Sequence, residues 1–132
     1  MPINSRQSVA AKGKPLMSNA GFILLWNDVK TGREKNAGEL FNATLAFYEK
    51  KVKEGVVDSY EPAILSRHGG VMNGFILVRG EHDKLATLRE SNDFREMEVK
   101  AIHCLSGFGV VEAHLGKNVA EHMKRWASAI PR

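Results

Sequence analysis

Four stretches of the chain have the length and the apolar character of β-strands. They lie at residues 21–28, 60–67, 71–80 and 108–116. Short runs of branched and aromatic residues between polar segments are typical of strands. Pro62 has no backbone N–H to give to a neighbouring strand, so we expect the second strand to lie at an edge of the sheet. The short turn "HGG" joins the second and third strands into a hairpin.

Three other stretches repeat apolar side chains every three or four positions, which is the period of an amphipathic helix. They lie at residues 37–55, 81–105 and 118–130. We expect Asn36 to cap the first helix, with Glu39 completing a capping box, and Gly55 to end it. In the second, the sequence "SND" predicts a break or a kink, because Ser, Asn and Asp offer the backbone competing hydrogen bonds.

These elements follow the βαββαβ order of the ferredoxin-like fold, an α+β architecture, with an extra C-terminal helix. We therefore expect a four-stranded antiparallel sheet of order 4-1-3-2 with both main helices on one face. Residues 21–132 form a single domain in this interpretation. Residues 1–20 are interpreted as a disordered leader, because they are polar and show no period. The folded pattern begins after Met17, so either Met1 or Met17 suits the natural start.

Both faces of the sheet centre are apolar, although two helices cover only one. Side chains alternate between faces along a strand, so Phe75 and Leu77 oppose Ile76 and Val78. Leaving large apolar side chains in water forgoes about 1.5–3 kcal/mol for each one. The last helix is one candidate to cover this face, and a second copy of the chain is the simpler one. We expect a homodimer whose sheets pack face to face.

Composition and charge limit the partners of the chain. It has 132 residues, of which 43% are hydrophobic and 26% charged, as in ordinary globular domains. No apolar run approaches the roughly 18 residues of a membrane span, and the lone Cys104 excludes an internal disulfide, so we expect a cytoplasmic protein without a membrane partner. The net charge is +4, but residues 1–20 carry three basic residues and no acid, which leaves +1 for the rest. A nearly neutral domain argues against a nucleic-acid partner. The sequence contains no Gly-rich phosphate-binding loop, so we expect no cofactor.

The stretch "NGFILVRG" is similar to part of an RNA-binding motif that begins with a basic residue, Gly and an aromatic. Of its three aromatic positions, only Phe75 holds a ring, whereas Leu77 and Gly80 occupy the others. Asn73 replaces the basic residue. Because Leu cannot stack on a base as a ring does, an RNA-binding module is the weakest of the hypotheses.

Four residues are candidates for a ligand-binding site at one end of the sheet. We take the third strand to run in the same direction as the first, so that Arg79 lies beside Trp26 and Asn27, and Tyr60 begins the neighbouring strand. Aromatic surface, a guanidinium and an amide suit a small aromatic ligand or a carboxylate. The alternative is that Trp26 packs in the core or the dimer interface and that Arg79 pairs with a carboxylate such as that of Glu81.

At the opposite end we expect His68 and His114 to approach each other, with Glu112 on the same face as His114. A His–Glu pair is typical of general acid–base catalysis near neutral pH. A metal site would need a third ligand that the sequence does not supply, so no metal is predicted. The alternative is that these are solvated polar residues near strand ends.

Residues 21–116 resemble the dimeric α+β barrel superfamily in their order of elements. The most similar segment is "LRESNDFREMEVKAIHCLSGFGVVEAHLG", where a short helix, a Ser-x-x-Phe step and a second helical piece lead into the last strand. Members of this superfamily include cofactor-independent antibiotic-biosynthesis monooxygenases, haem-degrading monooxygenases, isomerase-like and peroxidase-like enzymes, ligand sensors and proteins without known activity. The resemblance therefore implies a fold and not one function.

Particular positions narrow these alternatives. In the haem-degrading members a Trp lies three residues before the Ser and a haem-ligating His seven after it, where this chain has Leu88 and Glu98. The resemblance thus argues against haem degradation. Those enzymes also use an Asn on the first strand, which Asn27 matches, so a cofactor-independent monooxygenase or isomerase acting on a small aromatic or polyketide-like substrate is one hypothesis. We place another hypothesis before it: a non-catalytic module that binds a small apolar or aromatic ligand between its sheet and helices.

Overall fold

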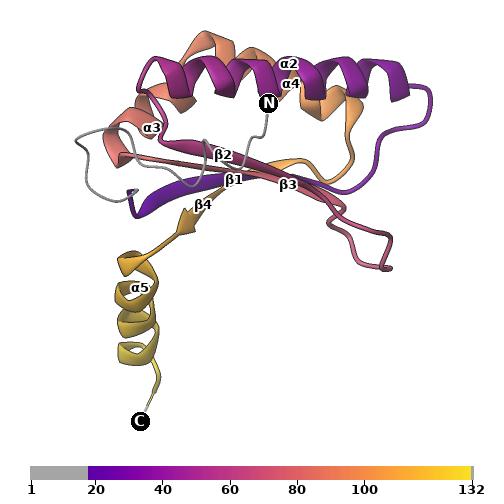
Figure 1. Ribbon diagram of the computed structural model, residues 1–132. Coiled ribbons are helices and arrows are strands. Elements are labelled where there is room, and N and C mark those ends of the chain that lie inside the picture. Colours follow the sequence, from indigo (N-terminus) through magenta and orange to yellow (C-terminus); the bar gives the residue numbers. More distant parts are fainter. Residues whose placement is uncertain (1–17, 132) are drawn as a thin grey trace.

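The computed structural model describes residues 18–131, which form one sheet with helices stacked on it (Figure 1). Residues 1–17, most of the predicted leader, lie outside the described residues. The strands are β1 (Ala20–Trp26), β2 (Ser59–Ile64), β3 (Gly74–Gly80) and β4 (Gly109–His114). The helices are α2 (Glu34–Lys53), α3 (His82–Glu90), α4 (Asn92–Cys104) and α5 (Lys117–Ser128). No helix within residues 18–131 is both long and apolar enough to cross a membrane.

The four strands form an antiparallel sheet in the order β2-β3-β1-β4. This is the predicted order 4-1-3-2 read from the other edge, so the prediction of a ferredoxin-like α+β sheet is confirmed. The strand that contains Pro62 lies at one edge, as its missing N–H requires. Helices α2, α3 and α4 all lie on one face of the sheet (Figure 1).

Ser91 divides the second helical segment into α3 and α4, as the "SND" sequence predicted. Its backbone is extended, with φ −69° and ψ 151°. Its Oγ donates to the carbonyl oxygen of Leu88 at 2.7 Å and accepts the backbone N–H of Phe94 at 3.3 Å. One side chain thus ends α3 and caps α4, and both Leu88 and Phe94 are buried beneath the helices.

The predicted start of α2 is wrong. The helix begins at Glu34, its N-cap is Arg33, and no side chain forms a cap hydrogen bond. Asn36 therefore lies inside the helix and forms no capping box with Glu39. Glu34 and Lys35 are good helix formers, and the left-handed turn that precedes them is made by Gly32 at φ 84°.

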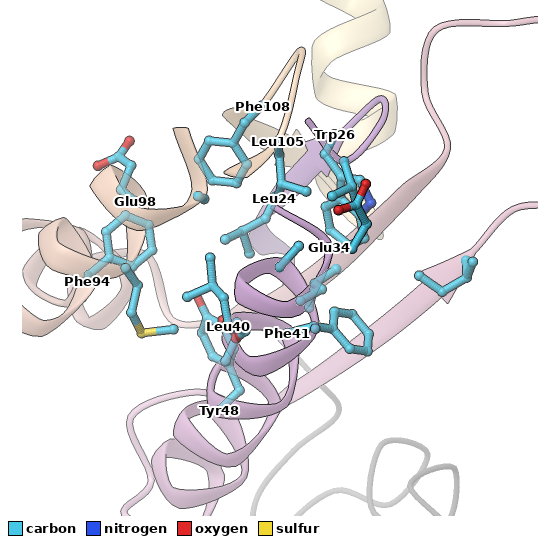
Figure 2. A pocket seen from close by; sticks show the side chains of 18 residues that line it. Leu24, Trp26, Glu34, Leu40, Phe41, Tyr48, Phe94, Glu98, Leu105 and Phe108 are labelled. Atoms are coloured by element: carbon cyan, nitrogen blue, oxygen red, sulfur yellow. Dashed lines mark hydrogen bonds between the residues drawn. The ribbon is translucent and has the colours of Figure 1, made fainter. Parts of the chain in front are cut away.

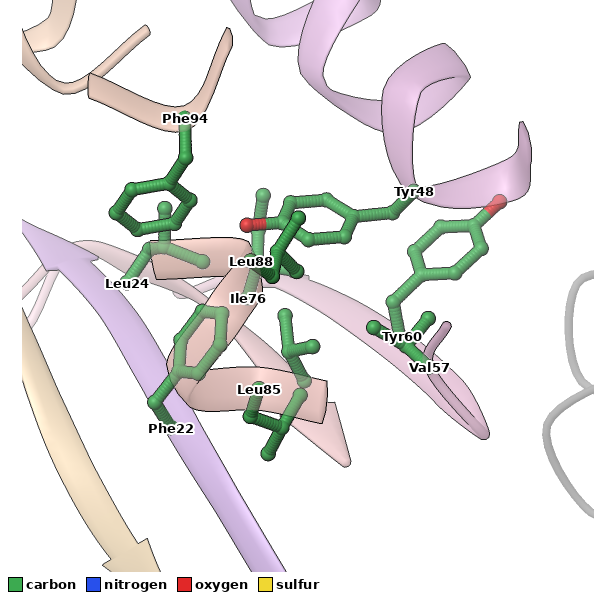
Figure 3. Packing of buried hydrophobic residues seen from close by; sticks show 10 residues of the cluster. Phe22, Leu24, Tyr48, Val57, Tyr60, Ile76, Leu85, Leu88 and Phe94 are labelled. Atoms are coloured by element: carbon green, nitrogen blue, oxygen red, sulfur yellow. The ribbon is translucent and has the colours of Figure 1, made fainter. Parts of the chain in front are cut away.

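The core lies between the helices and the face of the sheet that they cover. Figure 3 shows buried side chains from β1, β2, β3 and the helices converging there. Its members are Phe22, Leu24, Tyr48, Val57, Tyr60, Ile76, Val78, Leu85, Leu88 and Phe94. The rings of Phe22 and Phe94 meet edge to face at 5.7 Å, which joins β1 to α4.

The other face of the sheet, here called the open face, carries no helix within the described chain. Strand register places on it Ile23, Leu25, Phe75, Leu77 and Val111. The first four are half-buried and the last is 49% exposed. The last helix, which was one candidate to cover this face, does not do so, because α5 extends away from the sheet (Figure 1).

The beginning of α5 is fixed by contacts to the rest of the domain. The Asn19 carbonyl oxygen accepts the side-chain N–H of Asn118 at 2.9 Å, and its Oδ1 accepts the backbone N–H of Lys117 at 3.3 Å. The ring of His114 stacks on that of His122 at 4.2 Å. The apolar side of this helix is exposed, since Trp126 is 60% accessible.

Replacing Ser91 by Ala is expected to lower the free energy of unfolding by about 1 kcal/mol, because the cap of α4 is lost. Urea denaturation measures the difference. Ser66→Ala is the matched control, since Ser66 is exposed and its side chain has no hydrogen bond within residues 18–131. Equal stability of the two variants would contradict the role of Ser91.

Candidate functional site

A pocket of about 390 Å³ lies between the covered face of the sheet and helices α2 and α4 (Figure 2). Leu24, Trp26 and Ile76 line it from the sheet. Helix α2 supplies Ala37, Gly38, Leu40, Phe41, Thr44 and Tyr48, and α4 supplies Phe94, Met97 and Ala101. Leu105 and Phe108 line it from the segment before β4. The volume falls in the usual range of small-molecule sites, roughly 300–1,000 Å³.

Small side chains create this space. Ala37 and Gly38 on α2 and Ala101 on α4 stand where larger residues would fill the gap between the helices and the sheet. A Cβ added at Gly38 would have no neighbouring atom within 4 Å. Because packed interiors leave few voids larger than a water molecule, a gap of this size between a sheet and its helices is unusual.

Tyr48 carries the most unusual polar group of the pocket. Its side chain is fully buried, and its hydroxyl has no hydrogen-bond partner within the described chain. Figures 2 and 3 show the hydroxyl directed away from α2 and in among the pocket residues. Burial raises the pKa of Tyr48 well above its ordinary value, against the opposing charge of Arg89, so the phenol stays protonated. An unpaired buried hydroxyl costs about 1–3 kcal/mol.

Tyr60 gives a direct comparison, because its ring stacks beside that of Tyr48 at 6.2 Å. Its hydroxyl donates to Oε1 of Glu49 at 2.9 Å. Of two neighbouring buried tyrosines, one therefore has a partner and the other has none among residues 18–131.

The remaining polar groups of the pocket are few. The Thr44 hydroxyl already donates to the Leu40 carbonyl oxygen at 2.7 Å, as helix-interior threonines often do. Two carboxylates, those of Glu34 and Glu98, are part of the lining. No Lys, Arg or His of the described chain lines it.

The four predicted ligand-binding residues do not lie at one end of the sheet, so that part of the prediction is wrong. Strand β3 runs antiparallel to β1, which pairs Trp26 with Gly74 and Arg79 with Gly21. Tyr60 lies at the same end as Arg79. The physical reason is the β2–β3 hairpin. It reverses the chain direction, so β3 runs opposite to β1 and not in the same direction as we had assumed.

Each of these residues has a distinct environment. Trp26 lines the pocket, edge to face with Phe41 at 6.1 Å. Asn27 accepts the side-chain N–H of Asn73 at 2.7 Å and is not part of the lining. Tyr60 lies in the core beside Tyr48.

Arg79 lies on the open face of the sheet rather than beside Trp26. Its Nη1 donates to the carbonyl oxygen of Ser18 at 3.2 Å. The alternative pairing with Glu81 is not formed, and that carboxylate lies 3.6 Å from Nζ of Lys84.

The predicted approach of His68 to His114 is also wrong. His114 pairs with Ala20 at one end of the sheet, whereas His68 lies in the β2–β3 loop at the other (Figure 1). The Nε2 of His68 lies 2.8 Å from the Met72 carbonyl oxygen. Over residues 18–131, no three His, Cys, Asp or Glu side chains gather as a metal site would require.

Sequence reasoning placed Tyr48 on the buried face of its helix but missed its part in the pocket. The available signal was a phenol in an otherwise apolar stripe, since a buried Tyr usually finds a hydrogen-bond partner. Whether such a partner exists depends on side chains distant in sequence.

Replacing Tyr48 by Phe is expected to leave the free energy of unfolding unchanged or to raise it by about 1 kcal/mol, because the unpaired hydroxyl is removed. Tyr60→Phe deletes the same atom and is expected to lower it by about 1 kcal/mol, since Glu49 loses a donor. Urea denaturation of both variants measures the contrast. A clear loss of stability for Tyr48→Phe would mean that its hydroxyl is paired.

Comparison with known proteins supports the fold. The chain is similar to a solved structure described as a dimeric protein of unknown function and ferredoxin-like fold from Bacteroides fragilis NCTC 9343. The two share 9% sequence identity, with a TM-score of 0.53, over 76% of this chain and 100% of that chain. No model of a known protein family matches the chain, and neither does any curated protein. At this identity, the likeness shows that the chain has a ferredoxin-like fold and nothing finer.

Proposed function

We propose that the chain is a binding module for a small apolar or aromatic molecule, held in the pocket between the sheet and helices α2 and α4. One observation carries this proposal: beside an apolar pocket of about 390 Å³, the fully buried Tyr48 hydroxyl has no hydrogen-bond partner in the part of the chain that the structure describes. A group that costs stability in the free protein suits a site that a ligand completes.

The lining suits an apolar ring compound. Trp26, Phe41, Phe94 and Phe108 supply aromatic surface around the space. Burying about 250 Å² of apolar ligand surface contributes about 6 kcal/mol before the cost of association is subtracted, so the expected Kd is about 30 μM or weaker. Hydrophobic contact alone therefore predicts measurable affinity.

A catalytic role has less support than binding. The monooxygenase or isomerase alternative rests on the fold and on Asn27. The amide oxygen of Asn27 accepts a hydrogen bond from Asn73, and the residue lies outside the pocket lining. The titratable groups of the lining are Tyr48, which stays protonated, and the two glutamates. We therefore favour a module that binds without turnover.

The proposal includes a homodimer formed through the open faces of two sheets. Apolar side chains of β1, β3 and β4 lie there without a covering helix in the described chain, and such patches mark interaction sites. The similar protein from Bacteroides fragilis is described as dimeric, which supports the same state here.

An RNA strand is the alternative occupant of the open face. Phe75 lies on that face, where an RNA-binding sheet presents its rings. The next open-face position along β3 is Leu77, which cannot stack on a base, so we favour a second copy of the chain.

A cytoplasmic location completes the proposal. Cys104 is free and buried, and it forms no disulfide. A chain that does not rely on disulfides suits a reducing compartment.

Tetralin, an uncharged two-ring hydrocarbon, is expected to change the fluorescence of Trp26 saturably, with a Kd of tens to hundreds of micromolar. The chain has two tryptophans, so Trp126→Phe leaves Trp26 as the sole reporter. The matched control is Trp26→Phe, in which the exposed Trp126 should not respond. No saturable change up to the solubility limit, or an equal change in the control, would count against the pocket.

Leu77→Asp is expected to convert the dimer to a monomer, because it places a charge in the centre of the open face. Sedimentation velocity at micromolar concentration distinguishes the 14.6 kDa protomer from twice that mass. Val71→Asp, in the exposed β2–β3 loop, is the control and should remain dimeric. A monomeric wild-type protein would refute the proposed interface.

A further inference from the structure

We infer that the ligand of the pocket is an uncharged ring compound, and that the end of it that reaches Tyr48 carries a hydrogen-bond acceptor oxygen. This inference rests on the proposed function. The acceptor receives the hydrogen of the Tyr48 hydroxyl. The preferred ligands are therefore ketones and related neutral carbonyl compounds rather than hydrocarbons, and carboxylates are excluded.

The ligand is expected to carry an acceptor because the Tyr48 hydroxyl is a donor that lacks an acceptor within the described chain. Thr44 and Tyr48 are the two hydroxyl residues of the lining, and the first already donates to the Leu40 carbonyl oxygen. The Tyr48 hydroxyl has no partner within residues 18–131. Burial keeps this phenol protonated, so it has a hydrogen to donate throughout the neutral range.

The position of the acceptor follows from the arrangement of the pocket. Tyr48, Leu24, Ile76 and Phe94 are buried and form its inner end. Val29, Glu34 and Ile64 are exposed and form its mouth. Because the Tyr48 hydroxyl exposes almost no surface to the empty pocket, a ligand that enters at the mouth reaches it by displacing the side chains packed around it, and leaves its apolar body against Trp26 and Phe41.

The exclusion of anions follows from the charges around the space. The lining contains the carboxylates of Glu34 and Glu98 and, among the residues described, no cationic side chain. Arg89 is not part of the lining and lies over the ring of Phe22, 5.6 Å from its centroid. A carboxylate ligand would lose its hydration inside a lining that offers no cationic side chain, which is unfavourable at low dielectric, and the charge of Arg89 acts on Tyr48 only from outside that lining. The carboxylate ligand that Arg79 made plausible does not fit this pocket.

Three compounds built on the same two-ring skeleton test the inference: tetralin, 1-tetralone and tetralin-1-carboxylate. Equilibrium dialysis against wild type and Tyr48→Phe gives all six dissociation constants. For wild type, 1-tetralone is expected to bind about tenfold more tightly than tetralin, the effect of one additional buried hydrogen bond. The carboxylate is expected to bind at least tenfold more weakly than the ketone.

Tyr48→Phe should abolish the advantage of the ketone while leaving the affinity for tetralin within about twofold. This pattern separates a lost hydrogen bond from a damaged pocket, because only one of two ligands with the same ring skeleton is affected. Tyr60→Phe, the neighbouring tyrosine with its own partner, is the control and should retain the tenfold preference.

Each contrary result has a distinct meaning. Equal binding of tetralin and 1-tetralone to wild type would overturn the acceptor and leave the proposed binding function standing. A ketone preference that survives in Tyr48→Phe would overturn the role of Tyr48, and tight binding of the carboxylate would overturn the exclusion of anions. Binding of none of the three would overturn the proposed function and this inference together.

Discussion

The antiparallel pairing of β1 with β3 determines the rest of the structure. Its register sets Phe22 opposite Val78 and Leu24 opposite Ile76, and all four are buried beneath the helices. The alternate positions of the same two strands form the open face. A slip of one residue would exchange the two sets of side chains. Because both sets are apolar, this one register creates a core, a pocket wall and an uncovered apolar surface at the same time.

The pocket exists because the helices cover their face of the sheet incompletely. Small residues on α2 and α4 leave space where the packing of an ordinary core would be continuous, and Tyr48 brings a hydroxyl into that space. If packing were the only requirement at position 48, a phenylalanine ring would fill the same space without a hydroxyl. Tyr60, stacked beside it and hydrogen-bonded to Glu49, shows that the same core can satisfy a tyrosine. The contrast favours a functional reason for the unpaired group, since local violations of packing rules concentrate at functional sites.

The sequence alone predicted most of the fold and little of the site. Periodicity identified the elements, and the competing hydrogen bonds of Ser91 and its neighbours located the break between α3 and α4. The approach of Arg79 to Trp26 was wrong because it depends on strand direction, which follows from the number of chain reversals and not from any local pattern. Trp26, which the sequence offered as aromatic surface at a strand end, lines the pocket. The missing partner of Tyr48 could not be predicted, because it depends on how separate elements pack.

A crystal structure of the protein with 1-tetralone bound tests the central claim most directly. We expect the compound between the sheet and helices α2 and α4, with its carbonyl oxygen about 2.5–3.0 Å from the Tyr48 hydroxyl oxygen. Its rings should lie against Trp26 and Phe41, in the pocket of Figure 2. A carbonyl directed toward the mouth, or a ligand found elsewhere with the pocket closed, would contradict it.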